Sequence, residues 1–564
     1  MTPGAARPEH ALDLGGGDVV HPLPSRAALL LLLFFVLAAI VQTWPLAQHP
    51  NTWSRHDNGD SMLNEWAIAW IAHQLPRDPL HLFDANIFYP ERNTLAFSEH
   101  MFPQGVMGAP LLWLGAPTLL VHNLLLMGGL ALSGWTMSLV MWRWTGRWEA
   151  AMTAGLLLAF NAHTMTRLTH LQAMHLEFLP LAVYWLDRLL ARPRVATAVA
   201  LGGAIALQSL TSNYLLVAVV FAISAATIVR PGEWIGARHR RTLAMLGLAA
   251  AVAAVCVVPF LLPYQWAKAE EGLVRPLSVV AMYDASWADY LTTGGRFHFD
   301  GWSHAFWPAS KAALFPGVIA GLLTCVTLVN GSALRQPMMR AWFAIGVIGL
   351  ALSFGTKLPG YAVLYDVIPI LQGIRATVRL GFLVLVAVAA LAGFGLVQLL
   401  AALRMQGRAA GTALAISVMA AVSIEATRFP VGWVPKYRVP GVYQVLARAE
   451  RGAVVELPLP SRNAFGENAR YLLHSTLGWW PLVNGYSGFS PPRYETWYER
   501  LRRFPDEESL AALRDGRVRY VVIHRDAFLG RNPEGLEDLR RFPALRLLIA
   551  DGDIAIYRVE ASQP

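Results

Sequence analysis

Acidic side chains gather in one polar stretch of an otherwise apolar sequence. Residues 51–105 follow the first long apolar run and carry Asp57, Asp60, Glu65, Asp84, Glu99 and His100. A polar loop of this length between apolar segments is more often functional than a simple connector. A carboxylate placed there could act as a general base that takes the proton of a hydroxyl group. We therefore expect catalytic chemistry in this loop.

The residues after Asp60 predict the helix that would position it. Leu63, Trp66, Ala67, Trp70 and Ile71 recur at the spacing of one helix face. Tryptophan favours the membrane–water boundary, so we expect a helix along the membrane surface with its tryptophans at headgroup level. Asp57 or Asp60 could cap this helix, serve as a base, or do both, since Asp is a preferred N-cap.

Two arginines could balance the negative charge of a phosphate. Arg375 and Arg379 are four residues apart at the predicted outer start of an apolar run. That spacing predicts one shared helix face. Arginines at a phosphate stabilise the charge that develops there. The alternative is that both side chains extend to lipid headgroups.

Two further polar clusters fall at predicted outer turns. Arg167, His170 and Gln172 lie in the sequence RLTHLQAMH, and Asn213 and Tyr214 mark another turn that could line the same cavity. These side chains could bind sugar hydroxyls or a pyrophosphate, or they could simply be solvated turns. Glu177 lies close to a span, where an unpaired carboxylate is costly, and we expect Arg167 as its partner.

The composition predicts a membrane protein. Of the 564 residues, 55% are hydrophobic and 15% charged, against about 25% charged in soluble proteins. The formal net charge is +9, but the arginines lie in short loops and form no basic stripe, which argues against a nucleic-acid partner. The two cysteines, Cys256 and Cys325, lie in apolar runs and predict neither a disulfide framework nor a metal cluster.

Eleven apolar runs predict an all-α polytopic fold. They cover residues 27–47, 123–142, 149–166, 175–191, 195–212, 213–229, 242–262, 311–330, 339–356, 378–402 and 410–427. Alternate short loops are basic, so we expect a cytoplasmic N-terminus with a disordered tail over 1–26. A cleaved signal peptide is the alternative for the first run, but Trp44 and Pro45 make a poor cleavage site.

The expected domains are a transmembrane domain over 27–427 and a small extracytoplasmic α/β domain over 428–564. The first outer loop, 48–122, would hold the interfacial helix and, at 106–122, a re-entrant or interfacial one. Short β-branched runs predict strands at 452–458, 519–524, 545–551 and 553–559. Helical patterns lie around 494–503, 507–515 and 534–541.

Several phrases resemble bacterial members of the GT-C superfamily of integral membrane glycosyltransferases. They are GDSMLNEWAIAW, DPLHLFDANIFYP, LAFSEH, THLQAMHLEFLPLAVYWLDR, GTKLPGYAVLYDVIPILQGIRATVRLGF and NGYSGFSPP. The resemblance touches most of the chain. It implies an enzyme that transfers a sugar, with inversion, from a polyprenyl-phosphate carrier to a lipid, glycan or protein on the outer face.

The resemblance also implies roles for individual residues. The family places its base on the first outer loop, which nominates Asp60 first and Asp57 second. Arg375 and Arg379 would lie at the carrier phosphate, and the loop NGYSGFSPP would cover the mouth of the site. The other substrate-binding candidates are His100, Glu99, Arg167, His170, Gln172, Asn213 and Tyr214.

Other functions and a metal were weighed against this expectation. A transporter or flippase for lipid-linked glycans is one alternative, although no inverted repeat is visible and the polar residues gather on one side. A non-catalytic envelope scaffold is another. The Asp57/Asp60 pair could bind a divalent cation through oxygen, but no third ligand is assigned, so we predict no cofactor. The expected partners are a polyprenyl-phosphate sugar and membrane lipids, without nucleic acid.

Overall fold

The computed structural model describes residues 20–236, 238–532 and 538–560. The chain divides into two compact units, which are described separately below. The first unit comprises residues 1–48, 126–258 and 274–432, and the second comprises 49–125, 259–273 and 433–564. Each unit therefore combines segments that are far apart in the sequence.

Each of the eleven apolar runs contains an apolar helix. These helices are α1 Ser25–Gln42, α4 Thr118–Thr145, α5 Trp148–Ala159, α7 Phe178–Ala191, α8 Val195–Thr211, α9 Asn213–Ile228, α11 His239–Glu271, α15 Val318–Val329, α17 Pro337–Ser353, α19 Phe382–Ala402 and α20 Ala409–Ala426. Among the described residues, five helical stretches are long and apolar enough to cross a membrane: α1, α4, α11, α19 with the turn before it, and α20. The count of eleven spans stays a prediction.

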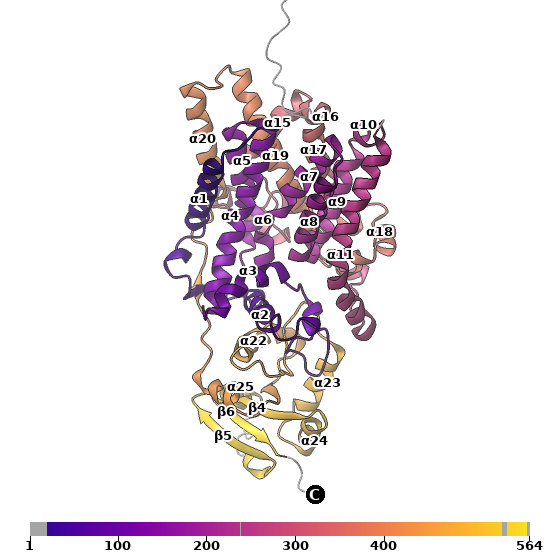
Figure 1. The fold of residues 1–564 in the computed structure, drawn as a ribbon. Helices are drawn as coiled ribbons and strands as arrows, with labels where there is room; N and C mark the ends of the chain where they lie inside the picture. Colours follow the sequence, from indigo (N-terminus) through magenta and orange to yellow (C-terminus); the bar gives the residue numbers. More distant parts are fainter. Residues whose placement is uncertain (1–19, 237, 533–537, 561–564) are drawn as a thin grey trace, which may run out of the picture. The chain divides into compact units, whose positions relative to one another are not determined.

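The helices of the first unit pack around α19. Helices α5, α15 and α17 contact α19, and α17 leads on to α9, α8 and α7, which lie side by side (Figure 1). Of the apolar window that covers α19, 89% is buried, against 17% in α1 and α11. The outer helices therefore expose an apolar surface that only lipid can cover without cost.

Small residues allow the close packing of α19. A Cβ atom on Gly395 would lie 2.0 Å from the carbonyl oxygen of Leu323 in α15. One on Gly393 would lie 2.9 Å from the carbonyl oxygen of Ala150 in α5. Helices that approach this closely in a membrane gain their stability from van der Waals contact between backbones.

The second unit joins the first outer loop to the C-terminal segment through backbone hydrogen bonds. The two-residue strands β1 Trp53–Ser54 and β2 Val434–Pro435 pair antiparallel. Phe88 N–H donates to Asn484 O and Tyr89 N–H to Leu482 O, at 3.1 and 2.8 Å. The sequence patterns gave no sign of this pairing, because they treat the loop and the C-terminal segment as separate regions.

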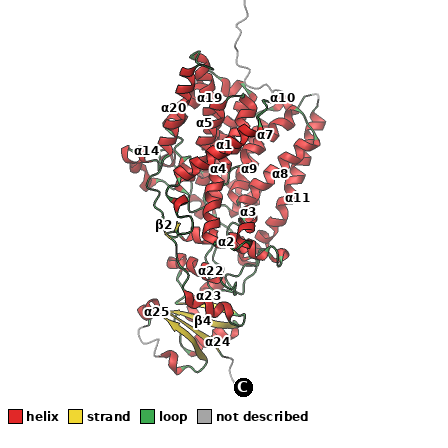
Figure 2. Ribbon diagram, turned by 60° about the vertical axis from the view of Figure 1, so that its left-hand side comes forward, coloured by secondary structure: helices red, strands yellow, loops and turns green. Residues whose placement is uncertain are grey.

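A four-stranded mixed sheet forms the centre of the C-terminal segment. Its order is β3 (Ala453–Leu457), β4 (Val518–His524), β6 (Ile554–Val559), β5 (Leu545–Asp551). Strands β3 and β4 are parallel, and the other pairs are antiparallel. All four predicted strands are confirmed. Figure 2 shows the strands with the short helices α24 (Glu507–Asp515) and α25 (Arg525–Arg531) beside them.

The helical patterns of this segment are confirmed where the structure describes them. The pattern at 494–503 forms α23, Pro492–Leu501, and the pattern at 507–515 forms α24. Residues 533–537 lie outside the described chain, so most of the third pattern, 534–541, is not described. The predicted tail over 1–26 likewise lies mainly outside it, because the description begins at residue 20.

The helix expected at Asp60 forms as α2, Gly59–Gln74, but its tryptophans are buried in protein. Trp66 and Trp70 are 1% and 5% exposed. Trp66 Nε1 donates to Asn86 Oδ1, and Trp70 Nε1 donates to Leu82 O at 2.9 Å. The apolar stripe was read correctly as a buried face, but protein rather than lipid buries it.

The interfacial position suits the next helix better. Helix α3, Phe102–Trp113, packs on α2, where a Cβ on Gly105 would lie only 2.6 Å from Ile71 Cβ. Its other face exposes Val106, Met107, Leu111 and Trp113, each at least 40% exposed. An exposed apolar face beside polar protein is typical of a helix in the plane of the membrane surface.

Asn58, rather than Asp57 or Asp60, caps α2. Its Oδ1 accepts the N–H of Asp60 at 2.9 Å, and Asp60 lies in the first helical turn. We expect Asn58→Ala to lower the free energy of unfolding by about 1 kcal/mol, the usual cost of a lost N-cap. Thermal unfolding in detergent measures this, with Asn58→Asp as the control that keeps a cap. Equal stability of the alanine variant and the wild type would contradict it.

Candidate active site

Asp60 is a half-buried carboxylate at the start of α2. Its Oδ1 accepts a hydrogen bond from the hydroxyl of Tyr486 at 2.8 Å. Tyr486 belongs to the NGYSGFSPP stretch, so the loop predicted to cover the site contacts the predicted base. A negative side chain in the first turn is also favoured by the helix dipole. The Tyr486 hydroxyl therefore holds the Asp60 carboxyl group in place.

Asp57 forms an ion pair with Arg55. Arg55 Nε donates to Asp57 Oδ1 and Arg55 Nη2 to Oδ2, both at 3.0 Å. This hydrogen-bonded ion pair lowers the pKa of Asp57. A carboxylate with a lowered pKa and both oxygens occupied is a weaker base. The ion pair with Arg55 therefore argues against Asp57 as the base, and the choice of Asp60 stays a prediction.

A second acid on α2, Glu65, joins the helix to two neighbouring segments by hydrogen bonds. Glu65 is buried, and its Oε2 accepts from His56 Nε2 at 2.8 Å while its Oε1 accepts from the hydroxyl of Thr118. Burial opposes the charged form most strongly, but the interactions with His56, Thr118 and His122 together outweigh it and lower the pKa of Glu65. His56 Nδ1 in turn accepts the N–H of Tyr437 at 3.0 Å. Glu65 thus has a structural role.

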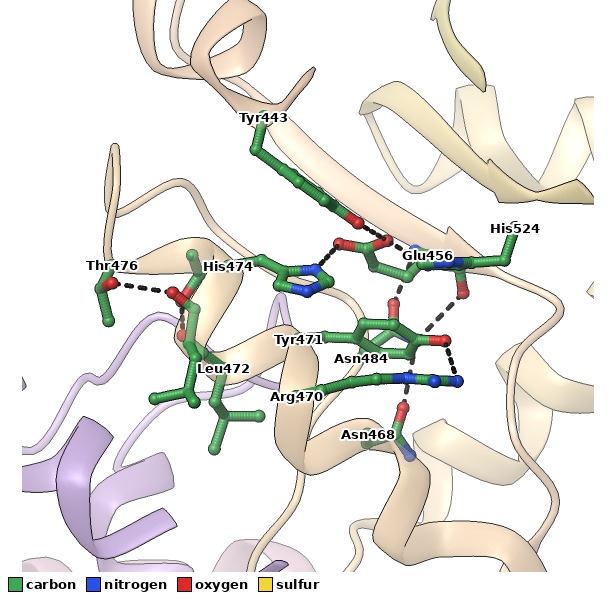
Figure 3. A network of polar contacts seen from close by, with 12 residues as sticks. Tyr443, Glu456, Asn468, Arg470, Tyr471, Leu472, His474, Thr476, Asn484 and His524 are labelled. Carbon is green, nitrogen blue, oxygen red and sulfur yellow. Dashed lines mark hydrogen bonds and ion pairs between the residues drawn. The ribbon is translucent and has the colours of Figure 1, made fainter. Parts of the chain in front are cut away.

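Tyr437 leads on to a buried polar network around Glu456 on β3 (Figure 3). The Tyr437 hydroxyl lies 2.8 Å from His474 Nε2, and His474 Nδ1 lies 3.3 Å from Glu456 Oε1. Glu456 Oε2 accepts from His524 Nε2 and from the hydroxyl of Tyr443, at 2.8 and 2.7 Å. Glu456 and His474 are fully buried.

The Glu456 network was missed in the sequence. Its one signal is a charged residue inside the apolar strand pattern GAVVELP. A buried carboxylate requires partners, but nothing in the sequence indicates that two histidines 18 and 68 residues away supply them. The network stabilises the unit that holds Asp60, because α22 (Ala469–Ser475), which carries His474, packs against α2.

In the first unit, the structure brings three of the predicted binding residues together. The guanidinium carbon of Arg379 lies 4.8 Å from the ring centroid of Tyr214. Arg379 Nη2 lies 3.4 Å from His170 Nε2, and the Thr169 hydroxyl lies 2.9 Å from His170 Nδ1. Arg379 thus contacts a residue from each of the two polar turns, and a shared cavity stays a prediction. A cation–π contact holds the guanidinium without neutralising its charge.

Arg375 extends this cluster but does not share a helix face with Arg379. Arg375 precedes the 3₁₀ turn Thr377–Gly381 that contains Arg379, and α19 begins only at Phe382. The N–H of Ala376 donates to the hydroxyl of Tyr214 at 3.0 Å, which holds this segment extended. The guanidinium of Arg375 lies 4.9 Å from the ring centroid of Tyr283. Two arginines thus stack on two tyrosines.

A third arginine makes this cluster strongly positive. Burial, together with the charge of Arg375, lowers the pKa of Arg275. Arginines this close repel one another unless an anion lies between them. We name the set Arg275, Arg375, Arg379, His170, Tyr214 and Tyr283 the arginine–tyrosine cluster.

The other predicted residues of the first unit lie at turns. Arg167 ends the short helix α6, Ala162–Thr166, and its carbonyl oxygen accepts the N–H of His170 at 2.8 Å. Gln172 lies in the 3₁₀ turn Leu171–Met174, and Asn213 begins α9. Glu177 was expected to pair with Arg167, but its Oε1 lies 2.9 Å from His175 Nδ1 instead.

His100 and Glu99 belong to the second unit. His100 is 4% exposed and lies among Phe83, Phe260 and Tyr264, with its Nδ1 accepting the N–H of Phe102. Burial lowers the pKa of His100 to about 3, so the ring is neutral. The adjoining Glu99 is half-buried. A substrate-binding role for either residue stays a prediction.

Asp57 and Asp60 are the candidate oxygen ligands of the loop for a divalent cation. Both oxygens of Asp57 already accept from Arg55. Within residues 20–236, 238–532 and 538–560, no group of three His, Cys, Asp or Glu side chains is placed to hold a metal ion. We therefore derive no step through a metal.

The long apolar helices and their packing around α19 define a multi-pass membrane protein. Its fold is similar to the folds of two solved membrane transferases. No family model matches the sequence, and no curated protein matches it. The assignment of the fold therefore rests on solved structures.

Two solved structures show the likeness. The mycobacterial arabinofuranosyltransferase AftD matches with a TM-score of 0.57 and 15% identity, over 96% of this chain and 40% of AftD. The oligosaccharyltransferase AglB of Archaeoglobus fulgidus, solved with an inhibitory peptide and a dolichol-phosphate, matches with a TM-score of 0.51 and 12% identity, over 95% of this chain and 75% of AglB. The chain thus spans two fifths of AftD, and at these identities the likeness shows the fold.

Proposed function

We propose that the protein is an inverting glycosyltransferase that moves a sugar from a polyprenyl-phosphate carrier to a lipid, glycan or protein acceptor on the outer face of the bacterial inner membrane. The observation that carries this proposal is Asp60, a fixed carboxylate in the first turn of α2 of a GT-C fold. The N-terminus lies in the cytoplasm and the C-terminal segment outside, as the basic loops predict.

The chemistry is a single displacement. Asp60 takes the proton of the acceptor hydroxyl, and the resulting oxygen attacks the anomeric carbon of the sugar. The bond from that carbon to the phosphate oxygen breaks, and the carrier leaves as polyprenyl phosphate with the bonding electrons. Attack opposite the leaving group inverts the configuration at the anomeric carbon.

The positive charge of the arginine–tyrosine cluster stabilises the negative charge of the leaving phosphate. Arg375 and Arg379 are held on tyrosine rings and keep their positive charge for an anion. Donors fixed in advance stabilise a developing charge without reorganisation during the reaction. A phosphate stabilised in this way needs no proton from a general acid.

Transfer by the purified protein in nanodiscs tests the proposal. Wild type is incubated with a panel of radiolabelled polyprenyl-phosphate sugars and an envelope extract as the source of acceptor, and label is followed into acceptor and water. We expect one donor to be consumed, with polyprenyl phosphate released. The assignment would be contradicted if the protein neither bound nor consumed any of the donors. It would also be contradicted if the protein moved intact donor between leaflets.

Arg379→Ala should weaken donor binding and slow transfer. Loss of one charge-bearing donor at a phosphate typically costs about 100-fold in rate. Arg379→Lys should recover part of the binding, because the charge remains while the stacked guanidinium is lost. Arg428→Ala, an arginine that donates to the carbonyl oxygen of Met165, provides the control. Equal donor affinity in all three variants and the wild type would contradict the role of Arg379.

A further inference from the structure

A second positively charged site lies at the other end of the first unit. It is a pocket of about 780 Å³, lined by Arg192, Pro193, Arg194, Arg238, His239, Arg240 and Arg241. We call it the basic pocket. Five of its seven lining residues are arginines and none is acidic. The two segments that form it are the loop 192–194 and residues 238–241, where α11 begins, and they are more than 40 residues apart in the sequence.

Two helices begin at the basic pocket and run away from it together. Helix α8 begins at Val195 and helix α11 at His239. Farther along, a Cβ on Gly202 of α8 would lie 2.5 Å from the carbonyl oxygen of Ala249 in α11, so the two helices pack side by side. Both helix dipoles therefore direct their positive ends to the pocket and add to the charge of the arginines.

Acidic side chains do not neutralise most of this charge. Nearby, the chain pairs the buried Arg230 with Asp187 at 2.8 Å and with Glu233. In the part of the chain that the structure describes, Arg238, Arg240 and Arg241 have no such ion pair. A concave set of arginines without acids binds phosphate well, because each guanidinium can donate two parallel hydrogen bonds.

Apolar side chains continue from the pocket along both helices. Val195 and Val199, one turn apart on α8, are 60% and 46% exposed, and Leu243 on α11 is 49% exposed. These residues belong to helices that the sequence and the fold place in the membrane. A ligand with an anionic head and apolar tails matches this combination, whereas a soluble anion would leave the apolar surface unused.

The basic pocket is separate from the arginine–tyrosine cluster. The pocket lies at the start of α8, and Tyr214 follows the end of that helix at Thr211. Seventeen residues at 1.5 Å each separate the two ends by about 25 Å, close to the thickness of the hydrocarbon core. The two sites therefore face phosphates at opposite membrane surfaces.

We propose that the basic pocket binds the phosphodiester headgroup of an anionic membrane lipid in the cytoplasmic leaflet, with its acyl chains along α8 and α11. Basic loops also orient membrane proteins, but orientation requires only charge near a span. Here two segments that are far apart in the sequence form one pocket at two helix N-termini. Their positive charges can therefore bind one headgroup together.

Lipid binding by the full chain tests this proposal. Delipidated protein in detergent is titrated with phosphatidylglycerol or phosphatidylcholine, and bound lipid is counted by native mass spectrometry. We expect phosphatidylglycerol to be retained at least ten-fold better than phosphatidylcholine by wild type. The double variant Arg240→Gln/Arg241→Gln should lose about ten-fold or more of that affinity. Arg192→Gln/Arg194→Gln, on the other loop, should show the same loss.

The matched control is Arg404→Gln/Arg408→Gln, which removes the same charge from another predicted cytoplasmic loop. It should retain wild-type affinity. Equal losses in this control and in the pocket variants would overturn the proposal, since they would indicate diffuse attraction. Competition by inorganic phosphate as effective as that by the lipid would also overturn it, in favour of a soluble anion. Transfer activity is not used, so failure here is distinct from failure of the proposed enzyme.

Discussion

Replacement of Asp60 by asparagine should abolish sugar transfer, whereas replacement of Asp57 should leave most of it. General-base catalysis contributes about 10²- to 10⁴-fold, and asparagine keeps the size of the side chain but cannot take the proton. Asp57 is already neutralised by Arg55, so its loss removes no available base. Initial rates of transfer at saturating donor measure both variants.

Controls separate catalysis from folding. Asp60→Asn should retain the wild-type thermal midpoint and donor affinity, because the amide oxygen still accepts from Tyr486. Tyr486→Phe should reduce transfer by less than Asp60→Asn, since the tyrosine orients the base and does not replace it. Full activity in Asp60→Asn would end the assignment of the base and direct attention to Asp57 and Glu99.

Replacement of Glu456 by glutamine should destabilise the second unit strongly. The carboxylate is fully buried and accepts from His474, His524 and Tyr443. Removal of one partner of a buried charged network costs about 3–5 kcal/mol. Hydrogen exchange of β3 and β4 should then rise well above the wild-type rate. Glu495→Gln, at an exposed pair with Arg462, is the control and should cost less than about 1 kcal/mol.

The same network predicts an acid-labile unit. Burial opposes the charged form of Glu456, but hydrogen bonds from His474 and His524 outweigh it and lower its pKa to about 2. A lowered carboxyl pKa gives stability that is present above about pH 4.5 and is lost as the pH falls toward 2. Glu456→Gln should lack this loss. Parallel pH profiles of the variant and the wild type would contradict the cause.

The sequence predicted the positions of the helices and strands better than it predicted what they pack against. Apolar runs and β-branched runs decide helices and strands locally, so the eleven apolar helices and the four strands fell where expected. The stripe of Trp66 and Trp70 identified a buried face, but hydrophobic periodicity does not distinguish lipid from protein as the cover. Whether protein or lipid covers this face depends on partners later in the loop, such as Asn86 and Leu82.

The candidate site was predicted in its residue types and only partly in its geometry. Arg379, His170 and Tyr214 meet as expected because polar side chains at outer turns have few other places to lie. Arg375 leaves the expected helix face because the hydroxyl of Tyr214, more than 160 residues earlier, takes the N–H of Ala376. The Glu456 network was missed for the same reason, since its members come from three separate segments.

The pairing of the first outer loop with the C-terminal segment has a consequence for biosynthesis. Asn86 donates to the carbonyl oxygen of Trp480, 394 residues later. At about 5–20 residues per second, the ribosome adds that partner roughly 20–80 s after the loop. During this time Trp70 lacks its ring contact with Trp479, and Asp60 lacks its hydrogen bond from the hydroxyl of Tyr486. The first outer loop therefore reaches its final structure only after the C-terminal segment has been synthesised.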